Sequence, residues 1–209
     1  MNNKKTILTI LFLGGLWGII EATFGYLIHF LPNGFPGMIM FPIAFYFIYT
    51  SYKQTGKQSA IFYTAIIAAL IKLSDLFIPL KSPISAINPA VSIVLESMIV
   101  FAFIKIYSEN RIYIKSAAMS LGWILLLVFS QRFIFHPVEG LYLKSFAEMI
   151  GFLIMNTIVS GMIIGTFLKL KQNSNFAILK FDFQKISYAM PVSLLLVAIF
   201  CEIGNSLLF

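Results

Sequence analysis

Long apolar runs, separated by short polar stretches, follow one another along almost the whole chain, from Thr6 to Phe209. A helix that crosses a membrane needs about 20 mostly apolar residues, and most of these runs are of that order. The pattern therefore predicts seven membrane-spanning helices. They cover residues 6–31, 36–52, 59–79, 86–107, 114–135, 145–169 and 188–209.

The second of these segments is the shortest, and Pro36, Gly37 and Pro42 all lie near its beginning. Because proline kinks or breaks a helix, this segment is either a tilted full span or a broken, partly re-entrant one. No polar stretch is long enough for a soluble domain. The sequence thus predicts one domain over residues 1–209, an all-α bundle of six to seven transmembrane helices.

Composition indicates the same class of protein. Hydrophobic residues make up 59% of the chain and charged residues only 11%, whereas a typical soluble domain has about 25% charged residues. The mean hydropathy is +0.91. We therefore expect an integral membrane protein whose surroundings are lipid.

The distribution of lysine and arginine predicts the orientation in the membrane. With a cytoplasmic N-terminus, the ends and loops that face the cytoplasm carry 11 of the 15 basic residues, as the positive-inside rule requires. These 11 are Lys4, Lys5, Lys53, Lys57, Lys105, Arg111, Lys115, Lys169, Lys171, Lys180 and Lys185. We expect a multi-pass protein of the cell membrane with the N-terminus inside and the C-terminus outside. The net charge of +7 then matches the anionic cytoplasmic leaflet, and no nucleic-acid role is predicted.

Most of the acidic residues lie inside the predicted spans rather than between them. An ionisable group at membrane depth costs several kcal/mol unless it faces a partner or water, so each one marks a functional site or a structural ion pair. Glu148 is only one turn inside its helix, where a carboxylate suits the helix N-terminus, and we predict a helix cap. The acidic residues concerned are Glu21, Asp75, Glu96, Glu148 and Glu202.

With the predicted orientation, the polar residues inside the spans converge on the outer leaflet. They mix both signs of charge with amides and a histidine, as a pocket for a small polar solute would. Lys72 and Asp75, three residues apart, could instead simply neutralise each other, which leaves a structural role open. The predicted solute-binding residues are Glu21, His29, Lys72, Asp75, Asn88, Glu96, Arg132, Glu202 and Asn205.

Small residues recur along the first helix, and the spacing places Gly14, Gly18 and Glu21 on one face. Together with Ala22, the glycines form the small-xxx-small spacing that lets helices approach closely. Either the stripe packs inside the chain or it docks another subunit. For the docking alternative we predict Gly14, Gly18 and Ala22.

Sequence motifs of enzymes are absent from the chain. It has no HExxH helix, no GxSxG turn and no phosphate-binding Gly-Lys-Ser/Thr loop, so we predict no catalytic residue, metal or cofactor. Asn88-Pro89 is expected to open a helix within the outer half of the membrane. Two other classes stay open: a proton-coupled secondary transporter, and an intramembrane lipid-modifying enzyme. An enzyme would have to use Glu21, His29, His136 or Glu148.

Two stretches carry a resemblance to a known family. The turn LPNGFPGMIMFPIAF at residues 31–45 and the following TGKQSAIFYTAIIAALIKLSDLF at residues 55–77, after a first helix rich in small residues, resemble the substrate-binding S components of energy-coupling factor transporters. The resemblance implies capture of a vitamin or a metal-related solute from outside and docking on a transmembrane coupling subunit with ATPases. It covers about the first half of the chain. That family usually has six spans, whereas seven are predicted here.

Overall fold

The computed structural model describes residues 3–28, 35–77, 83–106, 110–136, 141–173 and 188–208. Every regular element within these ranges is helical, so the predicted all-α fold is confirmed. Short π-helical turns continue α1 and α6, over Glu21–Gly25 and Gln131–Phe135, and 3₁₀ turns cover Leu73–Phe77 and Leu141–Leu143. The helices are α1 (Asn3–Ile20), α2 (Tyr26–Ile28), α3 (Phe35–Thr55), α4 (Ser59–Lys72), α5 (Pro83–Ile106), α6 (Ile112–Ser130), α7 (Phe146–Asn173) and α8 (Ala189–Leu208).

Each of the seven predicted segments coincides with one long helix, α2 being a short extension of the first. Five of the helical stretches are long and apolar enough to cross a membrane. They are Asn3–Gly25, Ser59–Phe77, Ala86–Lys105, Ile112–Phe135 and Phe146–Gln172. In α8 the apolar stretch Ala189–Gly204 is shorter. The described helices thus form an all-α bundle, and by length and composition they are compatible with a multi-pass membrane protein.

The second predicted segment is one continuous helix, α3, because Pro36 lies in its first turn, where proline is tolerated. Pro42 lies inside the same helix. The prediction that Asn88-Pro89 opens a helix is wrong. Both residues lie inside α5, which begins at Pro83, so no helix N-terminus is available beside Asn88.

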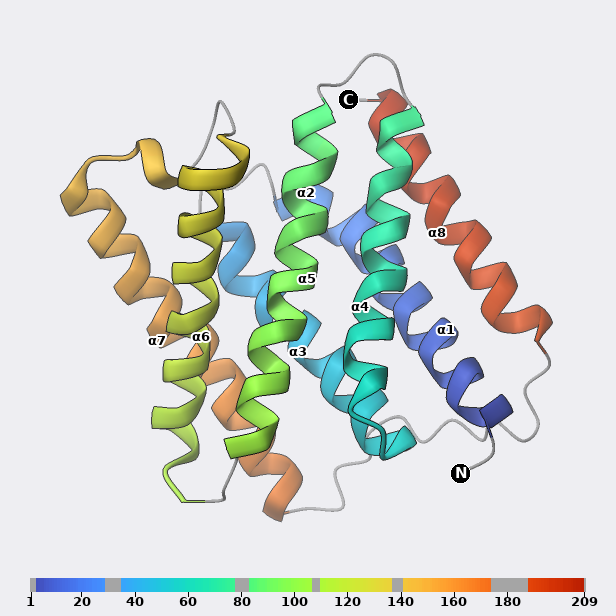
Figure 1. Ribbon diagram of the computed structural model, residues 1–209, viewed down its shortest axis with the longest axis horizontal. Coiled ribbons are helices and arrows are strands. Elements are labelled where there is room, and N and C mark those ends of the chain that lie inside the picture. Colours follow the sequence, from blue (N-terminus) through green and yellow to red (C-terminus); the bar gives the residue numbers. More distant parts are fainter. Residues whose placement is uncertain are drawn as a thin grey trace.

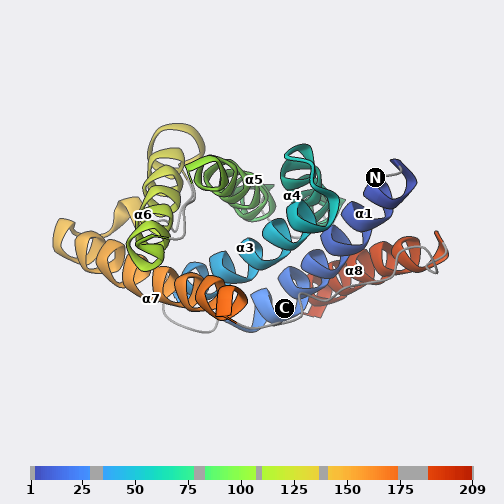
Figure 2. The same ribbon diagram turned by 90° about the horizontal axis from the view of Figure 1, so that it is seen from below.

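The helices form two layers. Figure 2 shows α7, α3, α1 and α8 side by side in one curved row, with α6, α5 and α4 along the other side. Within the rows α1 packs on α8 and α3, and α3 packs on α7; between the rows α1 packs on α4, and α6 packs on α7. Figure 1 shows that consecutive long helices run in opposite directions across the bundle.

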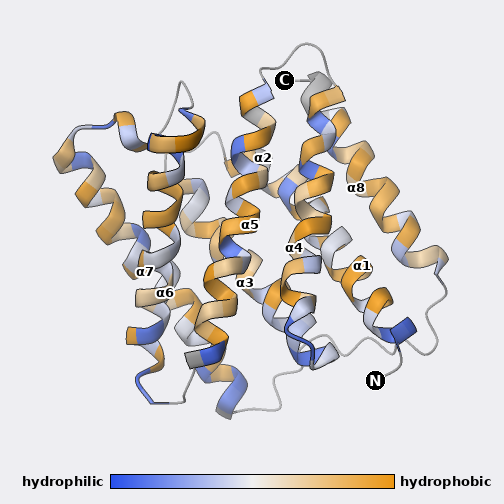
Figure 3. Ribbon diagram, in the orientation of Figure 1, coloured by the Kyte–Doolittle hydropathy of each residue, from blue (hydrophilic) through white to orange (hydrophobic). Residues whose placement is uncertain are grey.

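One end of the bundle holds the start of α1, the end of α3, the start of α4 and the end of α7 (Figure 1). We call this the N-terminal end. Most of the described basic residues gather there, and Figure 3 shows its helix ends as hydrophilic. These residues are Lys4, Lys5, Lys53, Lys57, Lys105, Arg111, Lys115, Lys169 and Lys171.

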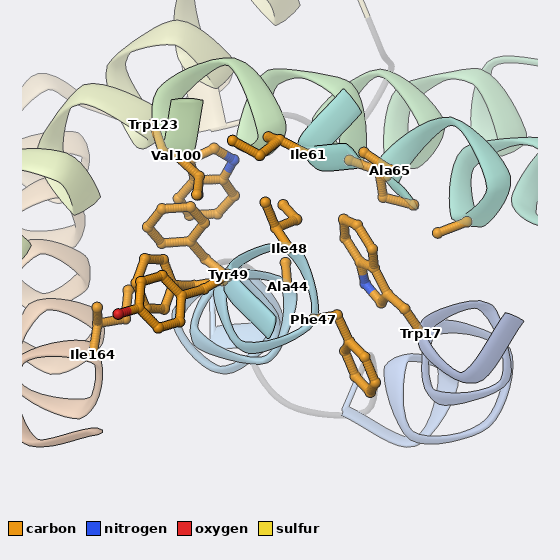
Figure 4. Packing of buried hydrophobic residues seen from close by; sticks show 14 of the residues in the cluster. Trp17, Ala44, Phe47, Ile48, Tyr49, Ile61, Ala65, Val100, Trp123 and Ile164 are labelled. Carbon is orange, nitrogen blue, oxygen red and sulfur yellow. The ribbon is translucent and has the colours of Figure 1, made fainter. Parts of the chain in front are cut away.

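The core lies between the two layers and is rich in aromatic residues. Figure 4 shows Trp17, Trp123 and Ile48 among the side chains that meet there. The ring of Phe41 on α3 stacks on the indole of Trp123 on α6, with centroids 4.8 Å apart and planes at 5°. Because lipid tails are as apolar as these side chains, such close packing holds the helices together more than hydrophobicity does.

The glycine stripe of α1 packs inside the chain. A Cβ added to Gly14 would lie 2.7 Å from the Ile67 Cβ and 3.0 Å from the Thr64 carbonyl oxygen of α4, and one added to Gly18 would overlap Ile71. Gly14, Gly18 and Ala22 are all buried. The contacts support internal packing, the first of the two predicted alternatives, because α4 already occupies the face of Gly14 and Gly18. A subunit-docking use of Gly14, Gly18 and Ala22 stays a prediction.

Candidate functional site

A change of helical geometry places Glu21. The α-helix α1 passes into a π-helical turn over Glu21–Gly25, and such turns are rare and concentrate at functional sites. Trp17, one turn earlier, donates its indole Nε1–H to the Glu21 Oε1 at 3.0 Å. On its other side the carboxylate lies over Gly25, where an added Cβ would be 3.3 Å from Oε2. The carboxylate is thus held by its own helix.

Glu96 on α5 is the second carboxylate of the site and is only 3% exposed. Its Oε2 is buried and has no hydrogen-bond partner among the described residues. The charges of Glu96 and Glu21 act on each other, and Ser92 lies one turn before Glu96. The two helices therefore bring together two carboxyls that repel when both are ionised.

A cavity of about 140 Å³ lies between these two carboxyls. Glu21 of α1, Asn88 and Glu96 of α5, and Trp123 of α6 all line it, so Glu21, Asn88 and Glu96 share one site as predicted. The other lining residues are Pro36, Gly37, Met40, Pro89, Ser92, Ile93 and Leu127. We refer to this space as the carboxylate cavity.

Gly37 and Trp123 were missed by the sequence analysis. A Cβ on Gly37 would lie 2.7 Å from Cη2 of Trp123, so the glycine makes room for the indole. No spacing along the chain links residues on different helices, and only the tertiary structure shows this pair. The contact of Trp17 with Glu21 could have been predicted, because Trp17 lies four residues before Glu21 and therefore on the same helical face.

A buried ion cluster lies beside the cavity. Lys72 at the end of α4 contacts Asp75 of the following 3₁₀ turn, with 3.3 Å between Nζ and Oδ2, and also forms an ion pair with Glu202 of α8. Asp75 is 5% and Glu202 2% exposed. The charge of Lys72 also acts on Glu21. The predicted residues Lys72, Asp75 and Glu202 thus meet, and Lys72 links their cluster to the carboxylate cavity.

Arg132 lies apart from the carboxylate cavity and from the ion cluster, and its role in solute binding stays a prediction. The preceding residue, Gln131, is buried and donates from Nε2 to the Asn88 Oδ1 at 3.4 Å, while its Oε1 accepts from the Leu141 N–H at 3.2 Å. Successive residues of a helix point in directions about 100° apart. Arg132 therefore does not share the inward direction of Gln131, and its side chain is exposed. It lines a separate, largely apolar cavity of about 830 Å³ with Phe129 and Lys144.

The remaining predicted polar residues have other places. His29 lies outside the described residues, as does the side chain of Asn205. His136 is exposed at the end of the π turn after α6, edge-on to Tyr142 with ring centroids 6.3 Å apart. Glu148 is the predicted helix cap: it accepts from the Ser145 N–H at 3.0 Å, and its own N–H donates to the Ser145 Oγ at 3.4 Å, which is a capping box.

Within the described ranges no group of three His, Cys, Asp or Glu side chains is placed to hold a metal ion. The carboxylate cavity instead offers two carboxyls, an amide, a hydroxyl and the indole N–H of Trp123, and its other described lining residues are apolar. No protein-family model, curated protein or solved structure matches the chain.

Proposed function

We propose that the protein is a membrane-embedded solute-binding component that captures a small polar, vitamin-like solute from the outer face for uptake. One observation carries the proposal: a cavity lined by two carboxyls, the half-buried Glu21 and the buried Glu96, lies inside a largely apolar helical bundle. Ionisable groups at membrane depth are costly and mark ligand or ion pathways. The position of Glu21 and Glu96 at the carboxylate cavity therefore supports a role in binding a solute.

The proposed orientation follows from the basic residues gathered at the N-terminal end, which faces the cytoplasm under the positive-inside rule. Glu21 follows the last turn of α1, and Asn88 lies near the start of α5. Both belong to the half of the bundle away from the N-terminal end. In the cell membrane, the carboxylate cavity would therefore lie in the outer half, within reach of an external solute.

We further propose that uptake uses a transmembrane coupling subunit with ATPases, as the resemblance to the S components implies. We do not assign the glycine stripe as the surface for this subunit, because α4 covers Gly14 and Gly18. Cysteine labelling tests the orientation. In a Cys201→Ala background, the cysteines of Lys57→Cys and Lys115→Cys should not react with an impermeant thiol reagent added to intact cells. Labelling of either cysteine from outside would contradict the proposed orientation.

The buried ion cluster favours a second candidate, a proton-coupled secondary transporter. Glu202 Oε2 is buried without a hydrogen-bond partner among the described residues, and Lys72 connects Glu202 electrostatically to Glu21. Carboxylates arranged in such a series serve as proton relays in transporters. Uptake that stops when the proton gradient is dissipated, with ATP maintained, would favour this candidate over the coupled component. An intramembrane enzyme has less support, since Glu148 caps a helix and His136 is exposed.

A ligand screen of the purified full chain tests solute binding. Vitamins, amino acids and metal ions are added in turn, and the melting temperature is measured for the parent, Glu21→Gln and Glu96→Gln proteins. We expect one solute class to raise the melting temperature of the parent and to lose this effect in both variants. Glu148→Gln is the matched control, because it makes the same chemical change at an exposed helix cap. A solute that stabilises all four proteins equally would place the site elsewhere.

A further inference from the structure

Among the described residues that line the carboxylate cavity, Glu21 and Glu96 are acidic and none is a lysine or arginine. Lys72 forms ion pairs with Asp75 and Glu202 in the neighbouring cluster. Glu21 has the indole of Trp17 and the more distant charge of Lys72. No cation of the described residues forms an ion pair with Glu96.

We propose that the solute of this cavity is a small organic cation with N–H donors, such as a primary ammonium, bound between Glu21 and Glu96. This inference rests on the proposed solute-binding function and specifies the charge of the solute. An ionised carboxylate only accepts hydrogen bonds, and an ammonium group offers three donors. The buried, unpartnered Oε2 of Glu96 is the acceptor that such a donor would satisfy.

The energetics favour a charged partner at Glu96. A buried acceptor without a partner costs about 1–3 kcal/mol, and a charged one costs more. A cation that enters the cavity removes this cost and forms a charge-assisted hydrogen bond, which is about twice as strong as a neutral one. Trp123 adds a second feature, since it lines the same space and its buried Nε1–H has no hydrogen-bond partner among the described residues, so it can donate to an acceptor atom elsewhere on the same solute.

The size of the cavity separates an organic cation from a bare metal ion. A single water needs about 10–15 Å³ of such space, and the cavity has about 140 Å³, which suits a molecule with several non-hydrogen atoms. The described wall also provides only two acidic ligands, Glu21 and Glu96. Asn88 also lines the cavity, but its amide is neutral, and its Oδ1 already accepts a hydrogen bond from Gln131.

The chain carries its own probe for this site. It has two tryptophans: Trp123 lines the cavity, and Trp17 is hydrogen-bonded to Glu21. Intrinsic tryptophan fluorescence therefore reports on the carboxylate cavity. Trp17→Phe and Trp123→Phe assign any change to one of the two indoles.

The experiment titrates the purified full chain, in nanodiscs, with methylammonium and butylammonium chloride. Butyramide is the neutral control of similar length, and sodium and magnesium chloride at matched ionic strength are the inorganic controls. We expect a saturable fluorescence change with the ammonium probes, accompanied by a higher melting temperature. In Glu96→Gln the amide oxygen still accepts a hydrogen bond but carries no charge, so the dissociation constant should rise about tenfold. Glu148→Gln should bind as the parent does.

The outcomes separate this inference from the function on which it rests. Equal responses to butyramide and butylammonium, a response to magnesium alone, or unchanged ammonium binding in Glu96→Gln would overturn the cationic solute. If a neutral or anionic solute from the ligand screen binds in a manner that depends on Glu21 and Glu96, solute binding stands and the charge assignment is wrong. If the ammonium probes bind as expected and cells take up none of them, the cation site stands and the uptake role is wrong.

Discussion

Trp17 donates its indole N–H to the carboxylate of Glu21, 3.0 Å away, at the point where α1 changes from an α-helix to a π-helix. Trp17 is fully buried, so the bond holds a costly carboxylate in one position inside the bundle. It also ties one wall of the carboxylate cavity to the core, since Trp17 belongs to the main cluster of buried side chains.

Trp17→Phe should lower the free energy of unfolding by about 1.5–3 kcal/mol, because a hydrogen bond to a charged group is lost along with some packing. Unfolding in mixed micelles measures the change. A cycle with Glu21→Met, whose side chain has no oxygen to accept from the indole N–H, isolates the hydrogen bond from the packing loss. Additive effects of the two substitutions would show that the bond contributes nothing measurable.

Gly14→Ala should destabilise the protein by about 1–3 kcal/mol through overpacking. The new methyl group would meet the Cβ of Ile67 and the backbone oxygen of Thr64, neither of which can move easily. Gly151→Ala is the control, because no atom lies within 4 Å of its added Cβ. Melting temperatures of both variants suffice. A normal melting temperature for Gly14→Ala, combined with lost uptake in cells, would instead restore a docking role for the stripe.

Lys72→Met should be the most damaging of these single substitutions, at about 3–5 kcal/mol, since it leaves Asp75 and Glu202 as buried carboxylates without their cation. Adding Asp75→Asn and Glu202→Gln to Lys72→Met removes the stranded charges and should recover much of the stability. Unfolding free energies of the single and triple variants provide the comparison. A triple variant no more stable than Lys72→Met would contradict a structural ion cluster.

Gly37→Ala should weaken solute binding and change the tryptophan emission. The added methyl would lie 2.7 Å from the Trp123 ring, and the stacked ring of Phe41 covers one face of that indole, so the indole has to shift. Fluorescence titration measures both effects. Gly122→Ala, one residue before Trp123, meets only Ile99 at an ordinary 3.4 Å and should bind solute normally.

Arg132→Gln should leave affinity for the cavity solute unchanged, because Arg132 is exposed and lines the separate apolar cavity. The same titration used for Glu96→Gln checks this expectation. A tenfold loss of affinity in Arg132→Gln would mean that the solute extends beyond the carboxylate cavity.

The positions of the helices were predictable from the pattern within each segment. The same patterns placed Glu21, Asn88 and Glu96 together, and all three line the carboxylate cavity. Apolar runs locate helices, and a shared depth in the membrane brings polar residues on different helices to one level. The face on which each residue lies was harder to predict. Arg132 has the right depth, but Gln131 takes the inward direction and Arg132, the next residue, is exposed.

Contacts between helices account for the other differences. The Gly37–Trp123 contact joins α3 to α6, and the glycine stripe fits α4, yet the small-residue spacing on α1 is the same for an internal and an external partner. The prediction that a helix begins at Asn88-Pro89 was wrong because proline, although common in the first turn of a helix, is also tolerated within membrane helices.

The tight fit of α1 against α4 has a mechanical consequence. Gly14 and Gly18 bring these helices so close, and Lys72 and Asp75 at the end of α4 are so firmly tied to α8, that α1, α4 and α8 should move as one rigid body. Glu21 belongs to that body, and α3 and α5 also pack on α4. Of the helices that line the carboxylate cavity, α6 with Trp123 is the one that packs mainly on α5 and α7 instead, so a hinge that admits the solute would swing α6 away from a stationary Glu21.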